Sequence, residues 1–110
     1  MDLVEAIAEY KSKIIDDYES WGGAISPVRQ KMIEEFKNGI TVDIGRKYAK
    51  VITTIGGRSV HSFIVIVHDD KKFKYGDILK AASWASPARN SARGNIFGKY
   101  TVKWTGANYL

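Results

Sequence analysis

The segment from Trp84 to Phe97 holds the polar residues of this chain that are best suited to chemistry. Two arginines, two asparagines and two serines lie between its terminal aromatic residues, and no amphipathic period runs through them. Guanidinium groups bind phosphates or carboxylates in bidentate fashion, and neighbouring amide side chains can share the ligand. The composition therefore indicates a surface that binds an anion or a nucleic acid.

The same segment fits either a loop or a short helix. Ser86-Pro87 is typical of a helix start, and a helix would bring Arg89 and Arg93 to one face, four residues apart. Asn90 would lie beside Arg89 and share its ligand. In the alternative reading, both arginines form ion pairs with the acidic N-terminal helix and Asn95 only closes a loop.

Aromatic residues are interleaved with this basic material, as they are where proteins stack and steer single-stranded nucleic acid. For any one ring, packing in the core is the alternative role. We expect Trp84 to stack, the asparagines to supply hydrogen bonds and the cations to contact phosphate. The candidate nucleic-acid or anion-binding residues are Lys80, Trp84, Arg89, Asn90, Arg93, Asn95 and Lys103.

Little in the sequence indicates catalysis. The chain has no cysteine, and its two histidines, His61 and His68, are seven residues apart and thus on opposite faces of an extended strand. His68 with Asp69 and Asp70 could bind a metal ion, but such clusters of ligands in turns are usually solvated, and a solvated turn is the favoured interpretation. No serine lies in a nucleophile elbow and no phosphate-binding loop precedes a helix. We expect a non-enzymatic protein without a metal or another cofactor.

The net charge of +5 is spread unequally over the chain. Residues 1–38 hold eight acidic and five basic residues, whereas residues 39–110 hold four acidic and twelve basic residues. Two of the glycine-containing turns in the second part, 45–47 and 56–59, are basic as well. A basic half can be the footprint of a phosphate-rich ligand. A surplus of lysine that only maintains solubility is the alternative.

The elements that must position these residues fit in one domain, residues 1–110, since 110 residues with 45% hydrophobic content can bury one core. Residues 1–38 are expected to be helical and residues 39–110 mainly β. The longest apolar run, 63–67, is too short to span a membrane, and the N-terminus has no apolar segment of a signal peptide. With no cysteine, a cytoplasmic protein that does not enter membranes is expected.

Two helices are predicted at the N-terminus. Apolar residues recur at three- and four-residue steps over residues 2–20, with Asp2 as the N-cap and Gly22-Gly23 as the end. A second helix follows Ser26-Pro27 and stops at Asn38-Gly39. Its predicted buried stripe consists of Val28, Met32, Phe36 and Ile40.

The remainder predicts short strands over residues 40–44, 48–55, 58–68, 77–82 and 100–104, with a turn at Gly56-Gly57. Both faces of residues 58–68 are apolar near the centre, which is typical of a central strand covered on both sides. Tyr100, Val102 and Trp104 should share one face of the last strand. The predicted fold is α+β, with two N-terminal helices packed on a mostly antiparallel sheet of about four to five strands.

The run from Phe73 to Phe97 contains Gly-Asp-Ile-Leu-Lys-Ala-Ala-Ser-Trp-Ala-Ser-Pro-Ala, and the chain closes with Trp-Thr-Gly-Ala-Asn-Tyr-Leu. This sequence motif resembles a motif in small uncharacterised proteins of tailed bacteriophages, where a short basic segment and an aromatic-rich tail follow it. The resemblance covers about the last third of the chain. It implies a phage origin and the host cytoplasm, and no catalytic residue. It also implies a shared role for Asp77, Lys80, Trp84, Pro87, Arg89 and Asn95.

The leading hypothesis is a phage-encoded accessory protein whose basic C-terminal half binds nucleic acid. The alternative is a protein-interaction module or inhibitor that acts on an acidic host protein, or a scaffold that forms a homodimer, since aromatic residues beside arginine are typical anchors of protein interfaces. A small enzyme is the least favoured hypothesis.

Overall fold

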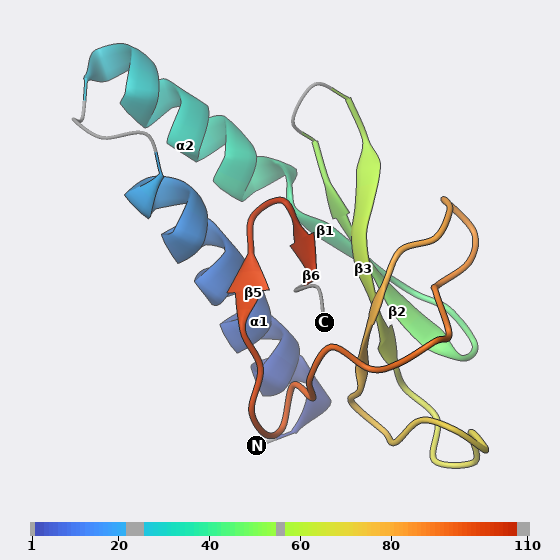
Figure 1. Ribbon diagram of the computed structural model, residues 1–110. Helices are drawn as coiled ribbons and strands as arrows, with labels where there is room; N and C mark the ends of the chain where they lie inside the picture. The colour runs from blue at the N-terminus through green and yellow to red at the C-terminus, as the bar shows by residue number, and fades with distance from the viewer. Residues whose placement is uncertain (1, 22–25, 55–56, 108–110) are drawn as a thin grey trace.

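The chain folds into two N-terminal helices followed by short strands, as Figure 1 shows for the computed structural model. The structure describes residues 2–21, 26–54 and 57–107. The elements are α1 (Leu3–Ser20), α2 (Pro27–Gly39), β1 (Thr41–Ile44), β2 (Tyr48–Thr53), β3 (Ser59–Val65), β4 (Ile78–Lys80), β5 (Val102–Lys103) and β6 (Gly106–Ala107). The predicted α+β class, with the helices first, is confirmed.

Local capping starts both helices where the sequence predicts. The Asp2 carboxylate accepts a hydrogen bond from the backbone N–H of Glu5 at 2.9 Å, and the Ser26 hydroxyl accepts one from the N–H of Arg29 at 3.1 Å. These side chains satisfy amide groups that have no partner inside the helix. The predicted turn glycines Gly22, Gly23 and Gly56 lie outside the described residues.

The predicted buried stripe of α2 is wrong in its first half. Phe36 and Ile40 are buried, but Val28 is 70% exposed and Met32 is also exposed. The outer ends of the two helices extend beyond the sheet, so the first turns of α2 have no strand to pack against (Figure 1). Arg29 is buried there instead: its guanidinium packs over the Tyr18 ring and donates to backbone carbonyl oxygens at the end of α1.

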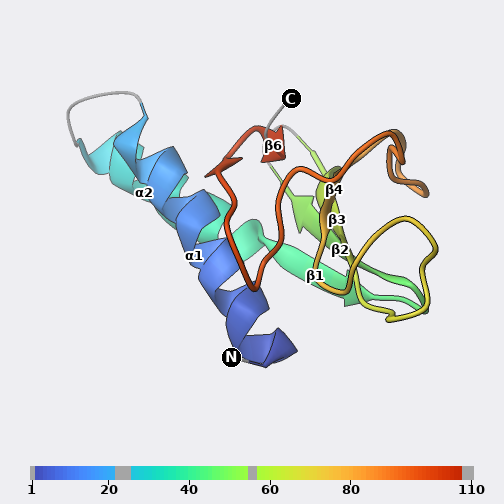
Figure 2. The same ribbon diagram turned by 60° about the horizontal axis from the view of Figure 1, so that its bottom comes forward.

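The sheet is antiparallel in the order β1-β2-β3-β4, and β3 is covered on both faces as predicted. Ile64 belongs to the core beneath the helices, whereas Phe63 and Val65 pack with Phe73 and Leu79 in a second core on the opposite face. Figure 2 shows the helices on one side of the sheet and the long loops on the other. The sheet therefore has one helical face and one loop-covered face.

The C-terminal strand is shorter than predicted and lies outside the main sheet. Among the described residues β5 pairs with β6 alone, and this hairpin lies between α1 and the sheet (Figure 1). The backbone N–H of Trp104 donates to the Asp17 carboxylate of α1 at 2.8 Å, which holds the hairpin on the helix. Tyr100, Val102 and Trp104 all pack against the helix-side core, so their predicted common face is confirmed.

The segment 83–95 is a loop, and the helical alternative is wrong. Its backbone runs back along β4: the N–H of Ala88 donates to Lys80 O and the N–H of Arg93 donates to Ile78 O, both at 2.7 Å. An exposed edge of β4 would leave these carbonyl groups unpaired, so the loop uses its own amides to cover that edge. Arg89 and Arg93 consequently share no helical face.

Candidate functional site

Trp84 is half-exposed and lies close to two cations on the loop-covered side of the sheet. Its side chain is 47% exposed, and the Nζ of Lys50 in β2 lies 4.6 Å from the centre of its ring. The Cζ of Arg58, which precedes β3, lies 5.5 Å from the same centre. Cations at these distances are attracted by the face of an indole ring. The loop after β4 thus brings together an aromatic surface and two positive charges.

A groove adjoins Trp84. It has a volume of about 330 Å³ and is lined by Arg58, Val60, Ala82 and Trp84, among others. A second groove, of about 370 Å³, is lined by Lys47, Tyr48, Lys50 and Asp43, among others. A flat ring can therefore reach the indole from the first groove, where Arg58 lies beside it.

Arg89 forms an ion pair with Asp70, so the predicted pairing with the N-terminal helix is wrong for this arginine. One guanidinium nitrogen of Arg89 donates to both carboxylate oxygens of Asp70 at 3.0 Å, and the other donates to the Tyr48 hydroxyl at 2.6 Å. The Nζ of Lys47 lies 3.0 Å from the same carboxylate, and the Nζ of Lys72 donates to Arg89 O at 2.6 Å. The cluster joins β2 to both long loops.

The Asp70 carboxylate stays ionised in this cluster. The Arg89 guanidinium is the main cause that holds the pKa of Asp70 far below its usual range, and the backbone N–H groups of Phe73 and Lys72 and the ammonium of Lys47 add to it. One carboxylate thus faces two cationic side chains. The cluster keeps a net positive charge.

These contacts are continuous from one end of the sheet face to the other. Lys50 also lies over the Phe63 ring, the Phe63 and Tyr48 rings are 5.7 Å apart, and Tyr48 bonds to Arg89. We call this surface the basic strip. It consists of Arg58, Trp84, Lys50, Phe63, Tyr48, Lys47, Arg89, Asp70 and Lys72. It contains five cations and one carboxylate, and Asp43 of β1 lies opposite Lys50 in the sheet register.

Asn95 supports a second aromatic group. Its amide nitrogen donates to Tyr75 O at 3.0 Å and to the Asp77 carboxylate at 2.9 Å, while its amide oxygen accepts from the N–H of Phe97 at 2.8 Å. The Tyr75 ring stacks on His68 at 4.2 Å and on Phe97 at 5.4 Å, with interplanar angles of 12°. We call these three rings the aromatic stack.

The other predicted residues do not form one site. Asn90 accepts a hydrogen bond from Arg93 at 3.4 Å in the loop, and Lys80 lies in β4. Lys103 lies in β5 beside α1, away from the basic strip, so the structure separates it from Trp84 and Arg89.

Sequence reasoning missed several residues of the strip. Lys50 is one alternating position of an ordinary strand, and nothing in its neighbours indicates its contact with a residue 34 positions away. For Lys47 and Arg58 the sequence contains a weak indication of phosphate contact, since both belong to basic turns. Nothing in the sequence indicates the role of His68, because the aromatic stack joins the connection between β3 and β4 to the segment that contains Phe97.

A buried polar cluster lies on the helix side of the sheet. The Tyr10 hydroxyl and the Ser62 hydroxyl are 2.7 Å apart, and His61 Nδ1 lies 2.9 Å from the same Ser62 oxygen. His61 Nε2 donates to Lys103 O at 2.7 Å, which leaves Nδ1 as the acceptor for the serine proton. His61 is the extra residue of a β-bulge, since Val51 pairs with Ser62 but Ile52 pairs with Val60.

This cluster resembles a nucleophile and its base only in residue type. Tyr10, His61 and Ser62 are all buried, so no substrate reaches the serine oxygen. Burial is the main cause that lowers the pKa of His61. The cluster joins α1, β3 and β5 and has a structural role.

Metal ligands and membrane segments were also sought. Within residues 2–21, 26–54 and 57–107, no three histidine or acidic side chains come together in a way that could hold a metal ion. In the same part of the chain, no helix has the length and apolar character needed to cross a membrane.

Together, the fold and the strip define a small α+β domain with a basic, aromatic sheet face opposite an acidic helical layer. Residues 2–109 match the family described as "Family of unknown function (DUF7717)", and the chain belongs to this family. No curated protein and no solved structure matches the chain. The family description names no activity, and the phage origin implied by the sequence motif stays a prediction.

Proposed function

We propose that this protein binds nucleic acid through the basic strip. The observation that carries the proposal is the half-exposed Trp84 ring with Lys50 and Arg58 over it. An aromatic ring stacks on a base of any sequence, and cations beside it neutralise the adjoining phosphates. The groove that Trp84 lines together with Arg58 gives a base access to the indole.

The charges along the strip support the same ligand. Lys47 and Arg89 share Asp70, and exposed Asp43 lies opposite Lys50 in the sheet register. Three further cations, Lys50, Arg58 and Lys72, still outnumber this second acid and can meet phosphates. Arg89 is fixed by Asp70 and Tyr48, so its role is to hold the loop in place as much as to bind. The acidic helices lie on the far side of the sheet (Figure 2) and would face away from the polyanion.

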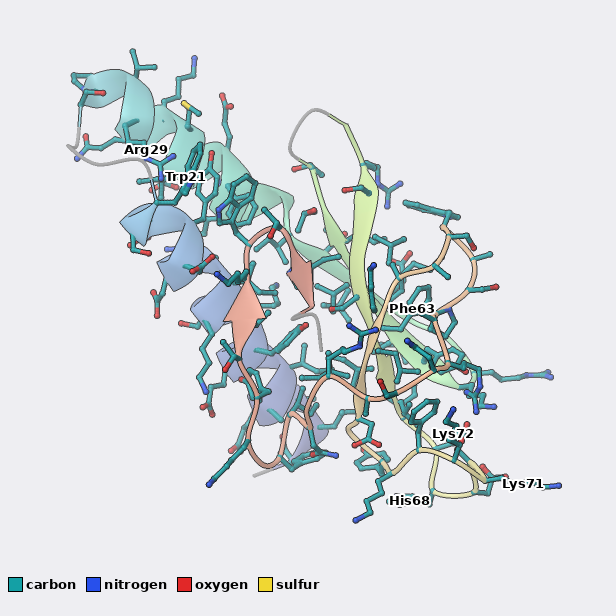
Figure 3. The ribbon with its side chains drawn as sticks, viewed as in Figure 1. Trp21, Arg29, Phe63, His68, Lys71 and Lys72 are labelled. Carbon is teal, nitrogen blue, oxygen red and sulfur yellow. The ribbon has the colours of Figure 1, made fainter. Side chains whose placement is uncertain are left out.

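Two exposed tryptophans provide a matched test of stacking. Trp84 lies on the strip, whereas Trp21, which is 53% exposed, lies at the far end of α1 (Figure 3). We expect Trp84→Ala to weaken binding of a labelled oligonucleotide by about 1–3 kcal/mol, and Trp21→Ala to leave it unchanged. Fluorescence anisotropy measures both, with circular dichroism to confirm folding. Equal affinities for the Trp84 variant and the parent would contradict the proposal.

A second matched pair tests the charges. For a single strand, the logarithm of the affinity falls with the logarithm of salt concentration with a slope of roughly −0.7 for each phosphate contact. Lys50→Ala should make this slope shallower by about 0.7, because it removes one contact. Lys31→Ala removes an equal charge from exposed α2 and should leave the slope unaltered. Binding that is indifferent to salt would overturn the proposal.

An acidic protein is the second candidate ligand, because the Arg89–Asp70 ion pair is a hydrogen-bonded carboxylate contact already made on this surface. A pull-down from a bacterial lysate, the host expected for a phage protein, separates the two ligands. A partner that is retained after nuclease digestion and lost in Lys50→Ala favours a protein. A partner that is lost on digestion favours nucleic acid.

A further inference from the structure

The aromatic stack lies where the basic strip ends. His68 and Tyr75 belong to the same connection between β3 and β4 that carries Lys72, the terminal residue of the strip. Figure 3 shows His68, Lys71 and Lys72 at one corner of the molecule, with Phe63 of the strip on the adjoining sheet. The strip therefore has an aromatic group at each end: Trp84 at one, the stack at the other.

The geometry of the stack is built in by its supports. Three hydrogen bonds of the Asn95 side chain fix the chain at Tyr75 and Phe97. Gly76 adopts φ +90°, and a Cβ atom there would lie 2.5 Å from the Phe97 ring, so only glycine allows this close approach. Phe97 is nevertheless 39% exposed and His68 is exposed. Rings held parallel at the surface offer a face on which a further flat ring can stack.

The surroundings of the stack favour a polyanion. Lys71, Lys72, Lys74 and Lys99 are all exposed and lie within four residues of a ring of the stack. Three acids lie close in sequence, but Asp70 is paired with Lys47 and Arg89 and Asp77 is hydrogen-bonded to Asn95, which leaves Asp69 as the exposed one. Cations outnumber the exposed acid, as they do along the strip.

We propose that Trp84 and the aromatic stack are two base-stacking sites on one path, and that the ligand is single-stranded nucleic acid. The inference rests on the proposed function and names its substrate class. Paired bases stack on one another inside a duplex and present only their edges, so rings at both ends of the strip can engage only unpaired bases. The strip itself supplies the cations between the two sites.

The first experiment compares strand states. Anisotropy is measured with labelled oligothymidylate of about 16 nucleotides and with the same strand annealed to oligodeoxyadenylate, a length at the upper end of common single-strand sites. We expect the single strand to bind at least about tenfold more tightly. Equal affinity for the duplex overturns this inference and leaves the proposed function intact, whereas the absence of salt-sensitive binding to either probe removes both.

The second experiment isolates the stack by strand length. Oligothymidylates of about 4 and about 16 nucleotides are compared, since the short strand can occupy one site only. The gain in affinity with length should shrink at least about fivefold in the His68→Ala/Phe97→Ala double variant. Trp21→Ala, an exposed aromatic residue outside the path, should keep the full gain. A full gain in the double variant, with its fold verified by thermal unfolding, would show that the stack is no binding site.

Discussion

At the residue scale, the Tyr10–Ser62–His61 cluster shows how one inserted residue directs two polar side chains into the core. The β-bulge at His61 turns both His61 and Ser62 toward α1, where a regular strand would send them to opposite faces. Each polar atom of the two side chains has a partner, so the cluster avoids the cost of an unpaired buried group. A histidine that could belong to a site is thereby committed to structure.

The pKa of His61 makes stability depend on pH. Burial lowers this pKa in the folded state, whereas the unfolded chain binds a proton near pH 6.5. The stability contribution is therefore present above about pH 6.5 and is lost as the pH falls through the folded pKa. Urea unfolding near pH 7.5 and near pH 5.5 measures the loss. His61→Gln should reduce the difference and exposed His68→Ala should retain it; equal pH dependence in His61→Gln and the parent would contradict the assignment.

At the scale of elements, two long loops position the side chains of the strip, and one of them is the segment for which a short helix was the alternative prediction. The 83–95 loop covers the edge of β4, and the connection between β3 and β4 carries Asp70, which fastens that loop through Arg89. Both loops therefore hold the side chains of the strip in a fixed order.

Asp70→Asn should loosen the 83–95 loop more than the sheet. The variant loses the charge that binds Lys47 and Arg89, while its remaining carbonyl oxygen can still accept backbone hydrogen bonds. We expect faster hydrogen exchange at the amide of Ala88, which bonds to Lys80 O, and unchanged exchange in β3. Mass spectrometry of peptides from the two regions measures this, and uniform acceleration would show that the cluster acts on the whole fold.

The lowered pKa of Asp70 means that its contribution to the stability of the fold is present above about pH 4 and is lost as the pH falls toward the folded pKa.

Gly76→Ala should destabilise the fold more than Gly57→Ala. Both glycines have positive φ, but a Cβ at Gly76 meets the Phe97 ring at 2.5 Å, whereas among the described residues nothing lies within 4 Å of a Cβ at Gly57. Backbone strain of about 1–3 kcal/mol applies to both variants, and displacement of the stack adds to it only at Gly76. Chemical denaturation compares the two. Equal losses would mean that the stack contributes nothing to holding the loop.

At the scale of the whole molecule, charge is separated into layers. The acidic residues concentrate in the helices, which lie on one side of the sheet (Figure 2). The basic strip lies on the opposite face with Phe63. Such a distribution orients the protein on a polyanion before any contact forms.

Photo-crosslinking tests this orientation. A single strand that carries bromouracil should crosslink to peptides that contain Trp84 or Tyr75 and Phe97, because these rings lie on the proposed path. Trp21 is as exposed as Trp84 but lies on the acidic layer, so its peptide should remain unlabelled. Labelling of Trp21 to a similar extent would show that nucleic acid is not confined to the strip.

Light scattering of the protein alone gives its mass in solution and tests the predicted homodimer.

The sequence by itself determined what depends on neighbours along the chain. Asp2 and Ser26 begin helices by accepting hydrogen bonds from amides three residues further along the chain. The apolar residues that β3 carries on both of its faces require burial on both faces. Only the tertiary structure decided the rest, because it depends on contacts between distant segments. The exposure of Val28 follows from how far α2 extends past the sheet, and the conformation of 83–95 follows from the open edge of β4. Trp84 and Lys50 come together only because a loop and a strand meet across the sheet. Local sequence patterns do not indicate such long-range contacts, because the free energy that selects them comes from burial and hydrogen-bond pairing in the assembled fold.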